Sequence, residues 1–315
     1  MTKPRTKGKT KKQHYVPQFL LRQFGHGKKL KEKLWVLDKR NASVFPAAVR
    51  DAAHENNFYE YHCEAGSADF EKLTEKLDTK VAPIVSEVLR SRRLPRSGEN
   101  FIWLSYLVAA QMLRTPKSRR DMENVTELII HKWGPEVAFE GDPRSIGEYG
   151  PEDSKISCIQ MLRDVPRFAK ILQEKIWCLC KAPVDSPFII SDNPVTRHNM
   201  LDRWPRGNLG LENLGIEAYM PLSPRLSLQI MCPSIAGAVL LTPELTEVYE
   251  RALRDEEPVK MRPENVEFTN SLQVIWAERF VYAGDRDHLK MPLDMLRTNP
   301  ELRAGPGTRQ THDEI

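Results

Sequence analysis

The fold of the first half depends on the longest apolar run of the chain, Phe101-Ile102-Trp103-Leu104-Ser105-Tyr106-Leu107-Val108-Ala109-Ala110-Gln111-Met112-Leu113. Ser97 offers an N-cap before this run, and Pro116 disfavours helical backbone in the residue that precedes it. We therefore expect one helix from Gly98 to about Thr115. The run is too short to cross a bilayer, and polar residues interrupt it, so we expect no membrane partner.

A second long helix precedes this one. Apolar residues recur at helical spacing from Asp69 to about Leu89, namely Phe70, Leu73, Leu77, Val81, Ile84 and Val88. The linker Arg90–Arg96 is short and contains Pro95, so the two helices should be antiparallel neighbours.

The remaining apolar segments are shorter and predict both strands and helices. The expected strands are Lys33–Asp38, Ser43–Val49, Ile176–Lys181, Phe188–Ser191, Tyr219–Leu222, Leu226–Met231 and Arg279–Tyr282. The further expected helices are Asp121–Trp133, Lys155–Gln173, Thr242–Arg254 and Pro263–Ala277. The pattern predicts an α+β fold, with an N-terminal α-helical layer that contains the long antiparallel pair and a C-terminal small mixed β-sheet with flanking helices.

We expect a single α+β domain over residues 13–283. The Gly/Pro-rich loop 134–151 is a candidate internal boundary, because its composition is that of a linker. The segments 1–12 and 298–315 are expected to be disordered tails.

Charge is distributed unevenly along the chain. The first twelve residues carry six basic side chains and no acidic one, namely Lys3, Arg5, Lys7, Lys9, Lys11 and Lys12. The remainder has 41 basic and 43 acidic residues, so its net charge is −2. A flexible basic arm can bind nucleic acid through phosphate contacts without sequence preference. The alternative is a terminus that only increases solubility.

Composition excludes several classes of protein. The five cysteines are scattered, and Cys178 and Cys180 merely share one face of an expected strand. Buried, reduced thiols and the lack of an apolar leader segment favour a cytoplasmic protein. The chain has no GxSxG, GxGxxG, GxxxxGK[ST] or HExxH motif, so common serine hydrolase, dinucleotide, P-loop and zinc-protease signatures are missing.

Polar residues interrupt the core-facing side of the helix pair. Gln111 and Arg114 continue the line of inward-facing leucines, and a buried arginine needs a partner. Antiparallel packing would place Glu71 and Glu75 level with them, one turn apart on a shared face. Such a group could bind a phosphate, a metal or a proton-transfer partner. The alternative is an interhelical salt bridge with one solvated glutamate.

Two further segments carry candidate site residues. The apolar stretch Ile189-Ile190-Ser191 ends in Asp192-Asn193-Pro194, which presents a carboxylate and an amide at a sheet edge, although both are also common turn residues. His14 precedes a short helix that starts at about Pro17. Its side chain could lie near an anion site at that helix or could bond a backbone carbonyl.

These segments together resemble the HYVP-motif family, the bacterial domain-of-unknown-function family numbered 4238, over most of residues 13–283. The blocks that carry the resemblance are His14-Tyr15-Val16-Pro17, Asn57-Phe58-Tyr59, Gln111 with Arg114-Thr115-Pro116, Ser191-Asp192-Asn193-Pro194, Tyr219-x-Pro221-Leu222-Ser223-Pro224, and Asn270 with Ala277-x-Arg279-Phe280-Val281-Tyr282. The family has no settled activity. The resemblance nonetheless selects the polar residues chosen above, and this implies one shared site.

The first functional hypothesis is a hydrolase that acts on a phosphate-containing substrate, specifically a metal-dependent nuclease. Glu71, Glu75 and Asp192 would bind Mg²⁺, since hard oxygen ligands favour that ion. The catalytic residues would be His14, as general acid or base, with Asp192 and Glu75.

In the same hypothesis, Gln111, Arg114 and Asn193 would bind the substrate, with Arg114 stabilising charge on the phosphoryl group. The alternative is a non-catalytic nucleic-acid-binding protein, or a sensor or scaffold in host defence. In that case the polar cluster would fix the fold and the basic arm would do the binding. A small-molecule hydrolase that uses Asp192 with a glutamate is a third hypothesis.

Overall fold

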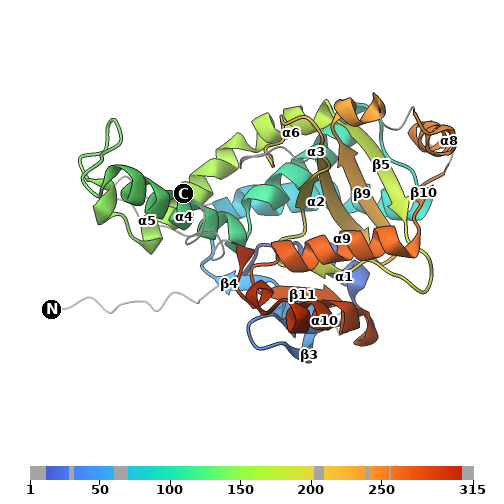
Figure 1. Ribbon diagram of the computed structural model, residues 1–315, viewed down its shortest axis with the longest axis horizontal. Helices are drawn as coiled ribbons and strands as arrows, with labels where there is room; N and C mark the ends of the chain where they lie inside the picture. Colours follow the sequence, from blue (N-terminus) through green and yellow to red (C-terminus); the bar gives the residue numbers. More distant parts are fainter. Residues whose placement is uncertain are drawn as a thin grey trace.

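A computed structural model describes residues 12–27, 32–59, 70–201, 209–237, 241–254 and 257–306, without the side chains of residues 70 and 71. Within these ranges the chain is an α+β protein (Figure 1). The α-helices are α1 (Gln18–Phe24), α2 (Phe70–Ser91), α3 (Gly98–Leu113), α4 (Pro116–Trp133), α5 (Pro151–Met161), α6 (Val165–Gln173), α8 (Pro243–Leu253), α9 (Pro263–Trp276) and α10 (Lys290–Thr298). None of the helices in the described ranges has both the length and the apolar character needed to span a membrane.

The larger sheet is mixed and lies between helices. Its strands are β5 (Ile176–Lys181), β7 (Thr196–Asn199), β8 (Ile216–Ser223), β9 (Leu226–Met231) and β10 (Val259–Lys260). The strand order is β10-β5-β9-β8-β7, in which β10 is parallel to β5 and the other neighbours are antiparallel. Every residue of the central strand β9 is buried, because α1–α3 and α6 pack against one face and α8 against the other.

A second sheet joins strands from both ends of the chain. Its strands are β2 (Lys33–Asp38), β3 (Ser43–Ala48), β6 (Ile190–Ser191) and β11 (Phe280–Ala283). The order is β3-β2-β11-β6, and all neighbours are antiparallel. Figure 1 shows α9 and α10 beside β11, and their apolar residues bury one face of this sheet. The sheets are therefore not confined to the C-terminal half, because β2 and β3 pair with the last strand.

The short strands β1 (Lys12–His14) and β4 (His54–Asn56) form a separate antiparallel pair. They hold the segment that leads into α1 against the residues that follow β3. Tyr15 N–H donates to the carbonyl oxygen of Ala53 at 3.1 Å, which extends this contact by one residue.

The two long helices run antiparallel and supply much of the core. Arg114, directly after α3, reaches Asp78 in the first half of α2, so the end of one helix lies beside the start of the other. Along α3, Leu104, Leu107 and Val108 are completely buried. The long apolar run therefore forms the central helix of the core, as its composition predicted.

Two helix boundaries differ from the sequence-based expectation. The helix α4 begins at Pro116 instead of Asp121, because the Thr115 hydroxyl accepts a hydrogen bond from Ser118 N–H at 3.4 Å and Pro116 occupies the first helical position. The single helix expected over residues 155–173 is two helices, α5 and α6, separated by a 3₁₀ turn at Leu162–Asp164.

The expectation of a disordered tail from Thr298 does not hold for residues 298–306. A 3₁₀ turn at Pro300–Arg303 follows α10, and its Leu302 is buried in the core beside β11. A Cβ atom at Gly305 would collide with the carboxylate of Glu278, so the backbone there packs directly on that group. The expected N-terminal tail 1–12 is also too long by one residue, because Lys12 lies in β1 opposite Asn56. The other tail residues, 1–11 and 307–315, lie outside the described part of the chain.

We predict that removal of residues 299–315 will destabilise the protein. Loss of the buried Leu302 side chain should lower the free energy of unfolding by about 2–4 kcal/mol. Removal of residues 307–315 alone should change it by less than about 0.5 kcal/mol. Urea denaturation measures both variants, and equal midpoints for the two would contradict the packing of this segment.

Candidate functional site

The Asp192 carboxylate organises the centre of the motif cluster. It lies directly after β6, where Asp192 N–H donates to the carbonyl oxygen of Phe280 at 2.9 Å. Its Oδ1 accepts from Glu278 N–H at 2.9 Å, and its Oδ2 accepts from Arg279 and Phe280 N–H at 2.7 and 2.8 Å. The side chain therefore accepts the backbone N–H groups of the bend that leads into β11.

Burial raises the pKa of Asp192, and the three backbone donors together with Lys39 oppose that rise. Two tyrosines from other motif blocks lie in the same electrostatic environment. Burial, with Asp192 as the next cause, raises the pKa of Tyr15, and burial together with Tyr15 and Asp192 raises that of Tyr282. The blocks His14–Pro17, Ser191–Pro194 and Arg279–Tyr282 therefore meet at the Asp192 carboxylate. The Asp192 residue is 1% exposed.

Side-chain amides on α9 complete the backbone hydrogen bonds of the β6 region. Asn270 accepts from Ile189 N–H at 3.0 Å and donates to the carbonyl oxygen of Pro187 at 2.9 Å. Gln273 accepts from Ser191 N–H at 3.0 Å and donates to the carbonyl oxygen of Pro194 at 3.0 Å. These amides serve the segment as a neighbouring strand would, because each offers a donor and an acceptor to main-chain groups.

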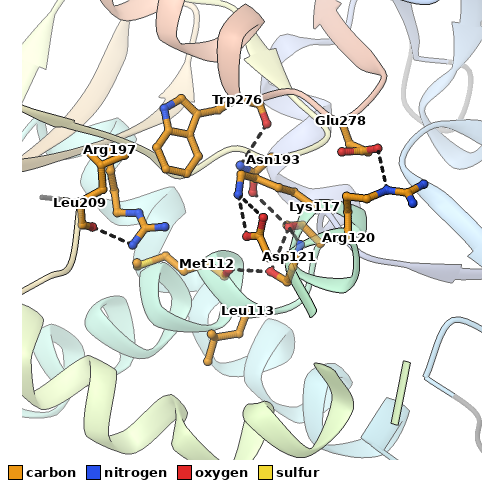
Figure 2. A network of polar contacts seen from close by, with 12 residues as sticks. Met112, Leu113, Lys117, Arg120, Asp121, Asn193, Arg197, Leu209, Trp276 and Glu278 are labelled. Atoms are coloured by element: carbon orange, nitrogen blue, oxygen red, sulfur yellow. Dashed lines mark hydrogen bonds and ion pairs between the residues drawn. The ribbon is translucent and has the colours of Figure 1, made fainter. Parts of the chain in front are cut away.

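Asn193 connects α9 to α4. Its Nδ2 donates to the carbonyl oxygen of Trp276 at 3.2 Å, and its Oδ1 accepts from the Thr115 hydroxyl at 3.0 Å. Figure 2 shows Asn193 between the end of α9 and the start of α4. The Lys117 ammonium and the Arg197 guanidinium lie 4.9 and 5.0 Å from the centre of the Trp276 ring. The predicted binding residue therefore holds two helices together.

Gln111 and Arg114 are buried beside the first motif block. Gln111 Nε2 donates to the carbonyl oxygen of Tyr15 at 3.2 Å, and its Oε1 has no hydrogen-bond partner among the described residues. The Arg114 guanidinium, which is fully buried, donates to Asp78 Oδ1 at 2.6 Å. Arg114 therefore has the carboxylate partner that its burial requires. That partner is Asp78 and not a predicted glutamate.

The two predicted helix glutamates do not join this cluster as expected. Glu75 is exposed to solvent on α2, and Asp78, almost one turn later, takes the position beside Arg114. The side chain of Glu71 lies outside the described part of the structure. Glu75 is therefore not the partner of Arg114, because the register between α2 and α3 brings Asp78, three residues later, beside the guanidinium.

His14 is partly buried in β1, and its side chain contacts those of His54 and Gln18. Its ring contacts that of His54 at a centroid distance of 5.5 Å, and its Nδ1 lies 3.4 Å from Nε2 of Gln18. Burial, with the neighbouring His54 as the next cause, lowers the pKa of His14 to about 4. A group with that pKa is a weak general base and a rarely protonated acid at neutral pH.

Sequence reasoning missed two ionisable groups of this cluster. Lys39 lies in the turn between β2 and β3, yet it is fully buried, and its Nζ donates to the carbonyl oxygens of Val274 and Ala277 at the end of α9. Burial, followed by the nearby Asp192 charge, raises the pKa of Glu278, which Arg120 approaches at 3.8 Å. No local signal marks Lys39, because a lysine in a turn is normally exposed.

The residues present do not fit a Mg²⁺ site of the predicted kind. Asp192 is occupied by three backbone donors, and Glu75 points to solvent. In the described ranges, no three His, Cys, Asp or Glu side chains form a group that could hold a metal ion. The arrangement is suited instead to fixing the positions of α4, α9 and β11 relative to one another.

We predict that Asp192→Ala will lower the free energy of unfolding by about 3–5 kcal/mol, because three backbone donors lose their acceptor. Asp192→Asn keeps one acceptor oxygen and should cost about 1–3 kcal/mol. The control is Glu75→Gln on the exposed face of α2, which should change stability by less than about 0.5 kcal/mol. Chemical denaturation decides, and an unchanged stability of Asp192→Ala would refute the structural role.

The low pKa of His14 makes stability depend on pH. The unfolded chain binds a proton at His14 below its ordinary pKa of 6.5, whereas the folded protein does so only near pH 4. The contribution of His14 is therefore complete above pH 6.5 and is lost as pH falls to about 4. His14→Gln should reduce this loss by on the order of 1–2 kcal/mol, given solvent screening of the partly exposed ring.

The matched control for this pH series is His131→Gln on the exposed surface of α4. Its unfolding free energy should follow the wild-type curve between pH 7 and pH 4. Parallel curves for the wild type and His14→Gln would show that His14 does not titrate differently on unfolding.

Comparison with known proteins places these blocks in one family. A family model described as "Protein of unknown function (DUF4238)" matches residues 12–287, which include every block of the cluster. No curated protein and no solved structure matches the chain. The chain is therefore a member of the DUF4238 family, and the matched residues include the buried network around Asp192.

Proposed function

We propose that this chain is a non-catalytic nucleic-acid-binding protein, in which the motif residues hold the fold and the basic segment 1–12 contacts the phosphate backbone. The observation that carries the proposal is the Asp192 carboxylate, which is 1% exposed and accepts three backbone hydrogen bonds. The three backbone donors use most of the acceptor sites of this carboxylate, and metal binding or protonation at Asp192 would compete with the contacts that shape β11.

The charges of the folded part support a role for the arm. The basic cluster at the start of α4 is neutralised within the fold, since Lys117 pairs with Asp121, Arg119 with Glu55, and Arg120 with Glu123. Outside residues 1–12 the chain has a net charge of −2, whereas those twelve residues carry +6. Of these six basic residues, Lys12 lies in β1 and pairs with Asp51. Association with a polyanion would therefore depend on the arm, and each neutralised phosphate would release counterions.

The salt dependence of binding tests this proposal. Fluorescence anisotropy would compare full-length protein with a variant lacking residues 1–11 on labelled single- and double-stranded DNA and RNA. If each of the five basic residues that the deletion removes contacts a phosphate, the slope of log K against log salt should decrease by about 4–5. A full-length variant with Gln at Lys3, Arg5, Lys7, Lys9 and Lys11 is the control for chain length, and it should behave like the deletion.

Equal affinity and salt dependence for all three proteins would overturn the role of the arm. The same samples should be incubated with Mg²⁺, Mn²⁺ or EDTA. Metal-dependent cleavage that is lost in folded His14→Ala would instead support the hydrolase hypothesis, and folded Asp192→Asn would show whether that carboxylate takes part.

A further inference from the structure

A cationic cavity is lined by residues that take no part in the buried network around Asp192. It has a volume of about 290 Å³ and is bordered by the end of α1, the end of α2, the end of β5 and the β8–β9 turn. Three of its lining side chains are basic, namely Arg92, Lys181 and Arg225. Among the described residues none of the three pairs with a carboxylate, in contrast to the neutralised cluster on α4.

The β8–β9 turn fixes Arg225 at the edge of this cavity. The Ser223 hydroxyl accepts from Arg225 N–H at 3.2 Å and from Leu226 N–H at 3.1 Å, which closes the turn. The carbonyl oxygen of Arg225 accepts from Ala182 N–H at 3.0 Å, next to Lys181. With the backbone held in this way, Nη1 of Arg225 is buried and has no hydrogen-bond partner in the described part of the chain. A buried donor of this kind normally has an acceptor.

The backbone of Arg92 is an independent indication of a site. Arg92 follows α2 with a φ of 57°, in the left-handed region, and its N–H donates to the carbonyl oxygen of Val88 at 2.8 Å. Glycine is the usual residue at such a position after a helix, because a Cβ atom there is strained. An arginine that adopts this strained conformation while lining a cavity suggests that its side chain is needed there.

We propose that this cavity binds a phosphate group, either that of a free nucleotide or that at the end of a nucleic-acid strand. Two guanidinium groups and one ammonium group match the charge of a phosphate, and the guanidinium fork matches its geometry. The amide of Gln23 adds a neutral donor, while Leu89 and Leu226 form apolar walls for the group attached to the phosphate. The volume is near the lower end of pockets that bind small molecules, roughly 300–1,000 Å³.

This inference goes beyond the proposed function, because a phosphate pocket in the folded part needs no basic arm. Experiment can reject the phosphate cavity and the nucleic-acid-binding arm independently of each other. A variant lacking residues 1–11 should retain phosphate binding in the cavity, whereas substitution of Arg92 or Arg225 should leave the contribution of the arm to salt-dependent binding unchanged.

The test measures binding of inorganic phosphate, a nucleoside 5′-monophosphate, and oligonucleotides with a 5′-phosphate or a 5′-hydroxyl, at constant ionic strength. Calorimetry and thermal denaturation would be used on full-length protein. In Arg92→Gly and Arg225→Gln the affinity for phosphate should fall about 10- to 100-fold, as expected for a lost charge-assisted contact. Arg93→Gln, which removes an exposed charge at the position after Arg92 but outside the cavity lining, should bind like the wild type.

Arg92→Gly also separates binding from folding, since glycine relieves the left-handed backbone and the variant should be at least as stable as the wild type. Preference for the free nucleotide would identify a small-molecule site, and preference for the 5′-phosphorylated strand a nucleic-acid end. No phosphate binding beyond that of chloride at equal ionic strength, or equal binding by the wild type and both pocket variants, would overturn the proposal.

Discussion

The fold depends on one buried carboxylate, that of Asp192, which accepts hydrogen bonds from a bend of the main chain. Asp192 accepts hydrogen bonds from three successive residues, Glu278 to Phe280, and its own N–H donates back to Phe280. This arrangement connects the loop after β6 to the start of β11 more rigidly than strand pairing alone, because β6 contributes only two residues to the sheet. The main-chain path into β11, and therefore the pairing of β11 with β2, follows from this contact.

The helix α9 extends the effect of that carboxylate to the rest of the molecule. Its amide side chains replace a missing strand beside residues 187–194, and the carbonyl groups at its end are satisfied by Lys39 and Asn193. Asn193 in turn holds the first turn of α4 through Thr115. Buried polar networks of this kind specify one arrangement of the elements, because every alternative leaves donors and acceptors unsatisfied.

Much of the secondary structure could be predicted from the sequence, since the apolar periodicity of β2, α2 and α3 is strong and local. The convergence of the motif blocks was also partly accessible, because Asn193 does bond Thr115 and Gln111 does bond the HYVP segment. The partner of Arg114 could not be predicted, because the register of two antiparallel helices depends on the conformation of their linker. A shift of nearly one turn exchanges an exposed Glu75 for Asp78. The burial of Lys39 is a tertiary effect, determined by carbonyl groups far away in the chain.

The pairing of the N-terminal strands with β11 also constrains how the protein is made. Arg279, at the start of β11, forms its ion pair with Asp38, which lies 241 residues earlier in the chain. At roughly 5–20 residues per second of synthesis, the hairpin of β2 and β3 exists for tens of seconds before its neighbouring strand leaves the ribosome. During that time the inner edge of β2 carries unpaired backbone groups and is open to pairing with other chains. Assembly of this sheet is therefore a late event of synthesis, and it closes the open edge of β2.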